Sequence, residues 1–110
     1  WSSDVCSSDL DLAARARAKQ LKPEEVAGGT FTITNPGVFG SIVGMPIINQ
    51  PQVGILCVEQ IEKRPVVVRD MITIQPMGYL SIGFDHRLID GALADQFMAR
   101  VKRSLEDEGH

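Results

Sequence analysis

The segment Gly78-Tyr-Leu-Ser-Ile-Gly-Phe-Asp-His-Arg-Leu-Ile-Asp-Gly91 contains the change of pattern that decides the fold. Up to Phe84 the residues alternate, with Leu80, Ile82 and Phe84 on one side, which predicts a strand over residues 78–84. From Gly91 onward, apolar residues recur at helical spacing, which predicts an amphipathic helix over residues 91–106. The segment therefore indicates a domain that combines a sheet with helices.

The junction between this strand and this helix holds the residues best suited to chemistry. His86 has a carboxylate one residue before it, Asp85, and another four residues after it, Asp90. Such neighbours can fix the tautomer of an imidazole and tune its pKa for general base catalysis. The alternative is that Asp90 caps the helix, Arg87 neutralises one of the two aspartates, and His86 packs at the junction. Spacing alone does not decide between them.

Upstream of the junction the sequence predicts four more strands and a helix. Residues 30–34 alternate three threonines with Phe31 and Ile33, which predicts a strand with a hydroxyl face. The glycines that follow, at 37, 40 and 44, indicate a loop. The remaining predictions are strands at 53–59, 65–68 and 71–74, the last two forming a hairpin, and a helix over 11–21 that ends before Pro23.

The first ten residues, Trp1 to Leu10, form a separate segment that shows neither a helical nor a strand period. They resemble the translation of a sequencing-adapter oligonucleotide, so we interpret them as a non-native appendage that precedes the domain at residues 11–110. Without them Cys57 is the lone cysteine, in an apolar stretch where it is expected to be a buried small hydrophobe. No disulfide framework is predicted.

Composition excludes several classes of partner. The 110 residues are 44% hydrophobic and 23% charged, which is typical of one globular domain. With 11 basic and 14 acidic residues the net charge is −3, so nucleic acid is not an expected partner. No apolar run approaches the roughly 20 residues of a membrane span. We expect a soluble, cytoplasmic protein without a membrane partner. The second histidine, His110, is terminal and expected to be inert.

Four segments resemble one known family in order and spacing. Asp85–Ala92 resembles the signature of the catalytic domain of the dihydrolipoamide acyltransferases of 2-oxo acid dehydrogenase complexes. Gly29–Ser41, Pro46–Gln52 and Arg64–Val68 resemble the family's strand with its glycine loop, the segment after it and the following strand. The resemblance implies a two-layer α/β sandwich of the chloramphenicol acetyltransferase type, with a mixed sheet and helices on one face. The family domain is more than twice as long, which implies truncation at the N-terminus.

The resemblance also implies roles for three residues. His86 matches the histidine that takes the thiol proton of coenzyme A or dihydrolipoamide. Thr34 matches the hydroxyl residue that donates a hydrogen bond to the tetrahedral oxyanion, although strand propensity alone would also explain a threonine there. Asp90 matches a supporting Asp or Asn, and helix capping would explain it equally well. No cofactor-binding residues are assigned.

The family further implies an assembly and its substrates. Its members are trimers with active sites between subunits, so His86 of one chain should meet Thr34 of the next, and the trimers form larger cores. Coenzyme A and the lipoyl group are the implied substrates, and no metal is expected. The implied partners are further copies of the chain, the 2-oxo acid dehydrogenase and dihydrolipoamide dehydrogenase. A lipoyl domain is not found in this chain.

Cys57, Val58 and Glu59 stand where the family more often has small residues, which we interpret as packing changes that do not touch the motif.

Alternatives of two other classes remain open. Antibiotic acetyltransferases and peptide-synthetase condensation domains share the His-x-x-x-Asp-Gly element, but they usually carry a second histidine where this chain has Asp85. A non-catalytic core subunit would have lost His86. Residues 38–41 followed by 46–51 resemble the 2-oxoglutarate branch, so we favour succinyl over acetyl as the transferred group.

Overall fold

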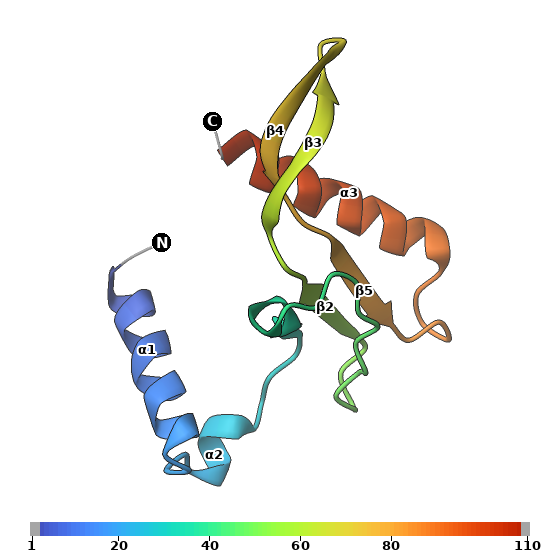
Figure 1. Cartoon of the computed structure of the whole chain (residues 1–110). Helices are drawn as coiled ribbons and strands as arrows, with labels where there is room; N and C mark the ends of the chain where they lie inside the picture. Colours follow the sequence, from blue (N-terminus) through green and yellow to red (C-terminus); the bar gives the residue numbers. More distant parts are fainter. Residues whose placement is uncertain (1–2, 109–110) are drawn as a thin grey trace.

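The computed structural model describes residues 3–108 and combines three α-helices, one 3-10 helix and five strands (Figure 1). In chain order they are α1 (Ser3–Arg17), α2 (Pro23–Val26), β1 (Thr32–Thr34), the 3-10 helix η1 (Pro36–Phe39), β2 (Gly54–Val58), β3 (Glu62–Val68), β4 (Met71–Met77), β5 (Leu80–Phe84) and α3 (Gly91–Glu108). The predicted mixture of helices and strands is confirmed.

The central sheet is mixed, as expected, and has the order β1-β2-β5 among the described residues. Strand β1 runs parallel to β2, with Thr34 opposite Cys57. Strand β5 runs antiparallel to β2, with Ser81 opposite Cys57 and Phe84 opposite Gly54. Because β2 is the middle strand, it holds most of the small core, where Ile55, Leu56 and Cys57 are buried.

The two faces of this sheet have different covers. On one face α3 places its buried Ala94 against the sheet, and the Phe97 ring lies 6.1 Å from that of Phe31. On the other face lies the loop after η1, since the Ser81 hydroxyl donates a 3.0 Å hydrogen bond to the Gly44 carbonyl. Residues in register across a sheet project to one face, so Thr34 and Cys57 lie on this loop side together with Ser81.

Strands β3 and β4 form a hairpin that is a separate two-stranded sheet. Arg69 and Asp70 both have positive φ, 53° and 61°, the backbone of the tight turns that match strand twist. Figure 1 shows the hairpin projecting away from the central sheet. Both strands are longer than predicted. Glu62, Lys63 and Arg64 lie before the predicted strand at 65–68, but backbone pairing with β4 makes them part of β3.

Residues 3–10 belong to α1, although their sequence shows neither a helical nor a strand period. Trp1 and Ser2 lie outside the described residues. Residues 12–17 are strong helix formers, and extending a helix is easier than starting one, so a helix that begins there can continue toward the N-terminus. The helix ends at Arg17 rather than Leu21, because Lys19 has a left-handed backbone with φ of 57°.

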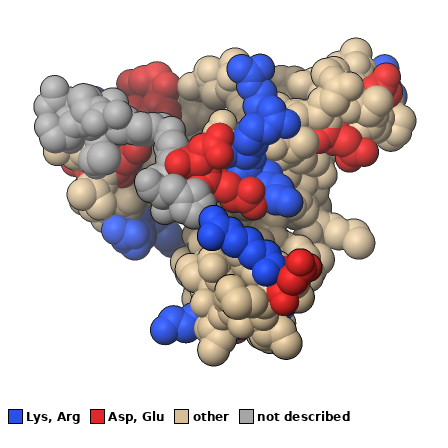
Figure 2. All heavy atoms as spheres, turned by 90° about the horizontal axis from the view of Figure 1, so that it is seen from above, with Lys and Arg blue, Asp and Glu red and all other residues tan. Residues whose placement is uncertain are grey.

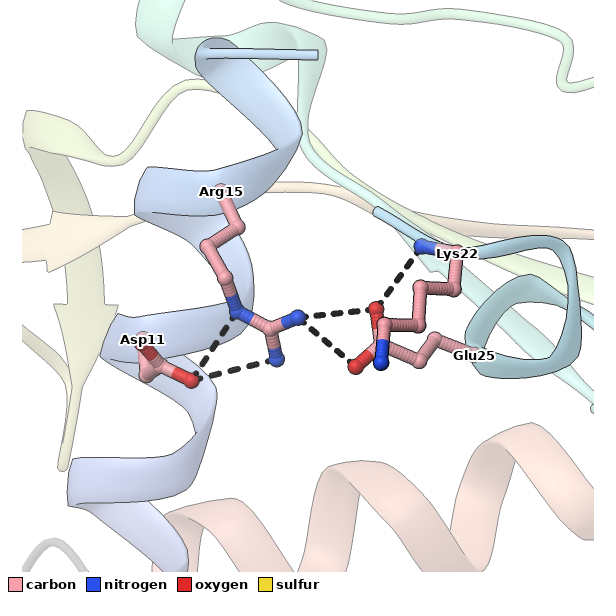
Figure 3. A network of polar contacts seen from close by, with 4 residues as sticks. All are labelled: Asp11, Arg15, Lys22 and Glu25. Atoms are coloured by element: carbon pink, nitrogen blue, oxygen red, sulfur yellow. Dashed lines mark hydrogen bonds and ion pairs between the residues drawn. The ribbon is translucent and has the colours of Figure 1, made fainter. Parts of the chain in front are cut away.

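A small ion-pair network joins α1 to α2 (Figure 3). Arg15 contacts Asp11 at 3.1 Å and Glu25 at 2.7 Å, and the Lys22 backbone N–H donates to Glu25 at 2.9 Å. The hydrogen bond from Arg15 lowers the pKa of Glu25. Since α1 lies apart from the sheet in Figure 1, this exposed network is a local connection between two helices.

Much apolar surface is exposed. Phe39 and Met45 on the loop are 91% and 95% exposed, and Ile72 on the hairpin is 80% exposed. The radius of gyration is 16.7 Å, whereas a compact chain of this length would have about 13 Å. Acidic and basic side chains are interspersed on the face shown in Figure 2. Within residues 3–108, no helix is long and apolar enough to cross a membrane.

Candidate active site

The junction between β5 and α3 is fixed by its backbone and by one ion pair. The Asp85 N–H donates to the Val53 carbonyl at 2.9 Å, which extends the pairing of β5 by one residue. Arg87 then binds both carboxylate oxygens of Asp85, at 3.0 and 2.8 Å, and its backbone N–H adds a third hydrogen bond. These bonds, first of all that from the Arg87 side chain, lower the pKa of Asp85 to about 2. Asp85 is therefore an ionised anchor of the turn.

His86 is exposed between these two anchored residues. Its ring lies 5.4 Å from that of Phe84, centroid to centroid. No hydrogen bond between His86 and Asp85 or Asp90 is present. The histidine thus belongs to a hydrogen-bonded turn while its side chain remains exposed. His110 lies outside the described residues.

Asp90 caps helix α3. Its Oδ1 accepts a 2.8 Å hydrogen bond from the Leu93 backbone N–H, as an N-cap side chain does. The capping interpretation is therefore realised, as is the pairing of Arg87 with Asp85. The cap and the ion pair both stabilise the conformation of the turn, and neither of them involves a nitrogen of His86.

Thr34 lies at the opposite end of the sheet within the same chain. It is in register with Cys57 and, across β2, with Ser81. From Ser81 to Asp85 the chain runs about 13 Å along the sheet, and Thr34 is about 10 Å away across two strand spacings. One chain therefore does not bring Thr34 and His86 together.

Next to Thr34 is a buried polar pair that sequence reasoning did not identify as functional. The Cys57 thiol donates to Glu59 Oε1 at 2.9 Å, and their side chains are 2% and 1% exposed. Burial raises the pKa of the thiol, and the thiol hydrogen bond lowers the pKa of the Glu59 carboxyl against the opposing effect of burial. The available signal was a glutamate and a cysteine where the family has small residues.

A metal centre has no support in the described part of the chain. Within residues 3–108, no three His, Cys, Asp or Glu residues lie close enough together to hold a metal ion.

Comparison with known proteins shows the family. The profile of the 2-oxoacid dehydrogenases acyltransferase catalytic domain matches residues 4–109. The chain is 50% identical over 96 residues to the dihydrolipoyllysine-residue succinyltransferase component of the 2-oxoglutarate dehydrogenase complex of Bartonella vinsonii, covering 87% of this chain and 23% of that protein. It is 45% identical over 105 residues to the mitochondrial component of the same name from Bos taurus, covering 96% and 23%.

Solved structures agree. A probable dihydrolipoamide acetyltransferase from Listeria monocytogenes superimposes with a TM-score of 0.88 at 44% identity, over 92% of this chain and 43% of that one. Azotobacter vinelandii dihydrolipoamide acetyltransferase, studied for the catalytic role of a serine, a histidine and an asparagine, gives a TM-score of 0.84 at 36% identity, over 89% and 40%. The expected chloramphenicol acetyltransferase-like fold is confirmed by these neighbours.

The chain spans about a quarter of the length of the curated relatives, 23% in both cases named here. Within that span the match includes the hydroxyl strand, the glycine loop, the hairpin and the histidine junction. The chain therefore belongs to the family of 2-oxoacid dehydrogenase acyltransferases and forms part of their catalytic domain.

Proposed function

We propose that this chain forms part of an acyltransferase that moves a succinyl group between dihydrolipoamide and coenzyme A in a 2-oxoglutarate dehydrogenase complex. Support for succinyl comes from the names of the two curated relatives. Both solved neighbours named above are acetyltransferases, so acetyl is the second candidate. The observation that carries the proposal is the accessible His86 on an anchored strand-to-helix turn.

His86 acts in this proposal as the general base. A thiol with a pKa near 8.5 is only slightly ionised at neutral pH, and the thiolate is the nucleophile. A neutral imidazole that accepts the thiol proton allows the sulfur to attack the thioester carbonyl. The exposed side chain is available to a substrate thiol. When the tetrahedral intermediate collapses, the proton held by His86 returns to the departing thiolate.

Thr34 donates a hydrogen bond to the oxyanion of that intermediate. Such a donor stabilises charge that develops only in the transition state. The intervals along the sequence support this role. The serine, histidine and asparagine of the Azotobacter enzyme are separated by 52 and 4 residues, and the same intervals separate Thr34, His86 and Asp90. Asp90 holds the end of α3 and so the geometry of the turn.

The site is formed between two chains of a trimer. Thr34 and His86 lie at opposite ends of one sheet, so a hydroxyl and an imidazole that act on one carbonyl must come from different copies. Trimers of this kind then build the larger core. Lipoyl groups and coenzyme A enter as substrates, and the other partners are the 2-oxo acid dehydrogenase and dihydrolipoamide dehydrogenase components.

The compartment is part of the proposal. We place the protein in the cytoplasm, as for a bacterial complex. The Bos taurus relative is mitochondrial, so the mitochondrion is the alternative for a eukaryotic source.

Complementation between two inactive variants tests this site. The assay uses a chimeric domain in which residues 11–108 of this chain replace the matching part of the Listeria relative. His86→Ala and Thr34→Ala chimeras are each expected to have little activity. Unfolded and refolded together in equal amounts, they should regain about a quarter of the unmodified activity, because that fraction of random interfaces pairs an intact histidine with an intact threonine.

Two controls make the result interpretable. Each variant refolded alone should regain nothing, and its assembly should match the unmodified chimera in size. No recovery from the mixture would contradict the shared site. An assembled, stably folded chimera without acyl transfer would contradict the function itself. Rates with succinyl- and acetyl-coenzyme A distinguish the two acyl groups.

A further inference from the structure

Glu59 is the most deeply buried charged residue among the described side chains. The roles proposed above for His86 and Thr34 do not involve it. It follows the last residue of β2 and is 1% exposed. A buried carboxylate is costly unless hydrogen bonds compensate it. Here the Cys57 thiol supplies one at 2.9 Å, while Oε2 makes no hydrogen bond of ordinary geometry.

The glycine loop, residues 35–50, packs against this residue. A methyl group on Gly44 would lie 2.8 Å from Glu59 Oε1, and one on Gly37 would lie 2.4 Å from the backbone of Glu59 and Gln60. Only glycine permits such close approach at these two positions. The Gln60 N–H also donates to the Ser41 carbonyl at 2.8 Å. The loop therefore rests on Glu59 and its neighbour at three points.

This loop is the direct continuation of Thr34. Only Asn35 separates Thr34 from η1, where Gly37 lies against the backbone of Glu59. The side chains of Thr34 and Cys57 are in register on the same face of the sheet. A shift of the loop away from Glu59 would thus move the backbone immediately after the proposed oxyanion donor.

The contact between the Glu59 carboxylate and the glycine loop is polar, which distinguishes it from nonspecific packing. Residues 35–50 contain no charged side chain, so the loop offers Glu59 no ion pair. The hydrogen bond from Cys57, first of all, and then the nearby Ser41 hydroxyl and Gly44 backbone N–H lower the carboxyl pKa against burial. The carboxylate thus lies in direct contact with the Gly44 backbone, through Oε1, while its own position is held by Cys57. A hydrogen bond to an ionised acceptor is stronger and more directional than a neutral one, so the Cys57 contact can fix the carboxylate against the loop.

We propose that Glu59 is a positioning residue: its carboxylate, held by Cys57, fixes the glycine loop and thereby the Thr34 hydroxyl where the oxyanion forms. The inference rests on the proposed function and assigns Glu59 to the same site. It acts through Thr34 and touches no substrate.

A double-mutant comparison in the chimeric domain tests the coupling. Thr34→Ala alone should lower kcat by about 10²-fold, the scale of losing one oxyanion donor. Glu59→Ala should lower kcat by ~10-fold or more with the KM for coenzyme A unchanged, since small misplacements of a catalytic group are that costly. In the Glu59→Ala background, Thr34→Ala should cost less than about threefold, because the hydroxyl is already misplaced.

Milder variants keep the test valid if Glu59→Ala does not fold. Glu59→Gln keeps the shape and an acceptor for Cys57, and should fall between the unmodified chimera and Glu59→Ala. Gly44→Ala pushes a methyl group into the same contact from the loop side and should reproduce the loss of kcat. Cys57→Ala removes the hydrogen bond to Glu59 and should lower kcat. Cys57→Ser retains a hydrogen-bond donor and should restore the kcat that Cys57→Ala loses. Glu62→Gln, on exposed β3, is the matched control and should change nothing.

The outcomes distinguish the role proposed for Glu59 from the role proposed for Thr34. If Thr34→Ala costs the same in both backgrounds while Glu59 variants only lower the melting temperature, Glu59 is merely structural and the inference is wrong. The same conclusion follows if Glu59→Gln and Gly44→Ala fold normally and keep full kcat. If Thr34→Ala has no effect in the unmodified chimera, the proposed role of Thr34 fails first.

Discussion

His86 combines a fixed backbone with an accessible side chain. The Asp85 carbonyl accepts hydrogen bonds from the N–H groups of Leu88 and Ile89, both at 3.0 Å, and the Asp85 N–H is bound to β2. The turn therefore closes on itself around the histidine. A general base needs this arrangement, since its nitrogen must be placed accurately and still reach a substrate proton.

Removing the imidazole should remove the proton transfer. In the chimeric domain, His86→Ala should lower acyl transfer by the ~10²–10⁴-fold typical of losing a general base, with the assembly size unchanged. Leu88→Ala is a matched control, because Leu88 is 71% exposed in the same turn and has no proposed role. A thioester assay and size-exclusion chromatography measure the two effects. Retained activity in His86→Ala would leave His86 as a packing residue of the junction.

Asp85 predicts how the stability of the turn depends on acid. Arg87 lowers the pKa of Asp85 from 3.8 to about 2 in the folded chain. Because the folded pKa is the lower one, this stabilisation is present above pH 4 and is lost as the pH falls through about 2. The difference in urea midpoint between the unmodified chimera and Asp85→Asn should therefore shrink from pH 5 to pH 2. Arg87 is 84% exposed, so the difference will be small. A constant difference would contradict the ion pair.

At the junction, the contacts of single residues could be predicted from the sequence where both partners lie close together in the chain. The cap by Asp90 and the pairing of Arg87 with an aspartate involve residues two or three positions apart, so spacing offered them as one of two interpretations, and the structure shows both contacts. Glu59 contacts Gly37 and Gly44, which are remote in sequence, and no local pattern indicates that contact. The separation of Thr34 from His86 depends on strand order and direction, which the sequence pattern did not supply.

Among the elements, those with strong periodicity were predicted best. The strand before the junction and helix α3 lie within a few residues of their predicted bounds. Burial along helix α3 does not follow its apolar stripe. Leu93, Phe97 and Leu105 belong to its apolar stripe, yet Ala94 is the buried residue and these three are 43–57% exposed. In the sheet, Phe31 and Ile33 are exposed, whereas Leu80 and Ile82 are half-buried beside the helix.

The turn of the β3–β4 hairpin can be improved. Arg69 and Asp70 have positive φ, which costs an L-residue without special tolerance roughly 1–2 kcal/mol. Asn-Gly is the preferred pair for this geometry. Arg69→Asn with Asp70→Gly should stabilise the chimera by about 1 kcal/mol, measured by urea unfolding. Arg69→Ala with Asp70→Ala removes the same two charges without relieving the strain and should give no gain. A loss of stability in the Asn-Gly variant would contradict this account of the turn.

At the scale of the whole chain, the origin of the first ten residues is open to direct test. We propose that they derive from a sequencing adapter, although the family match begins at residue 4 and α1 begins at Ser3. The side chains of residues 7–10 are exposed, so the sheet does not depend on them. Resequencing the native gene across this junction should not find codons for Trp1 to Leu10 before Asp11. Finding them in contiguous template would make Cys6 native.

The isolated chain should fold poorly. It spans 43% of the Listeria domain, and its sheet leaves the outer edges of β1 and β5 unpaired within the described residues. Unpaired edges and exposed apolar side chains such as Phe39 and Met45 favour association. The 110-residue chain should therefore aggregate or remain partly unfolded, and it should transfer no acyl groups, because the site proposed between subunits requires an ordered interface. Size-exclusion chromatography, thermal melting and a thioester assay measure these properties. A monodisperse, cooperatively melting and active chain would show that the rest of the domain is dispensable for both the fold and the site.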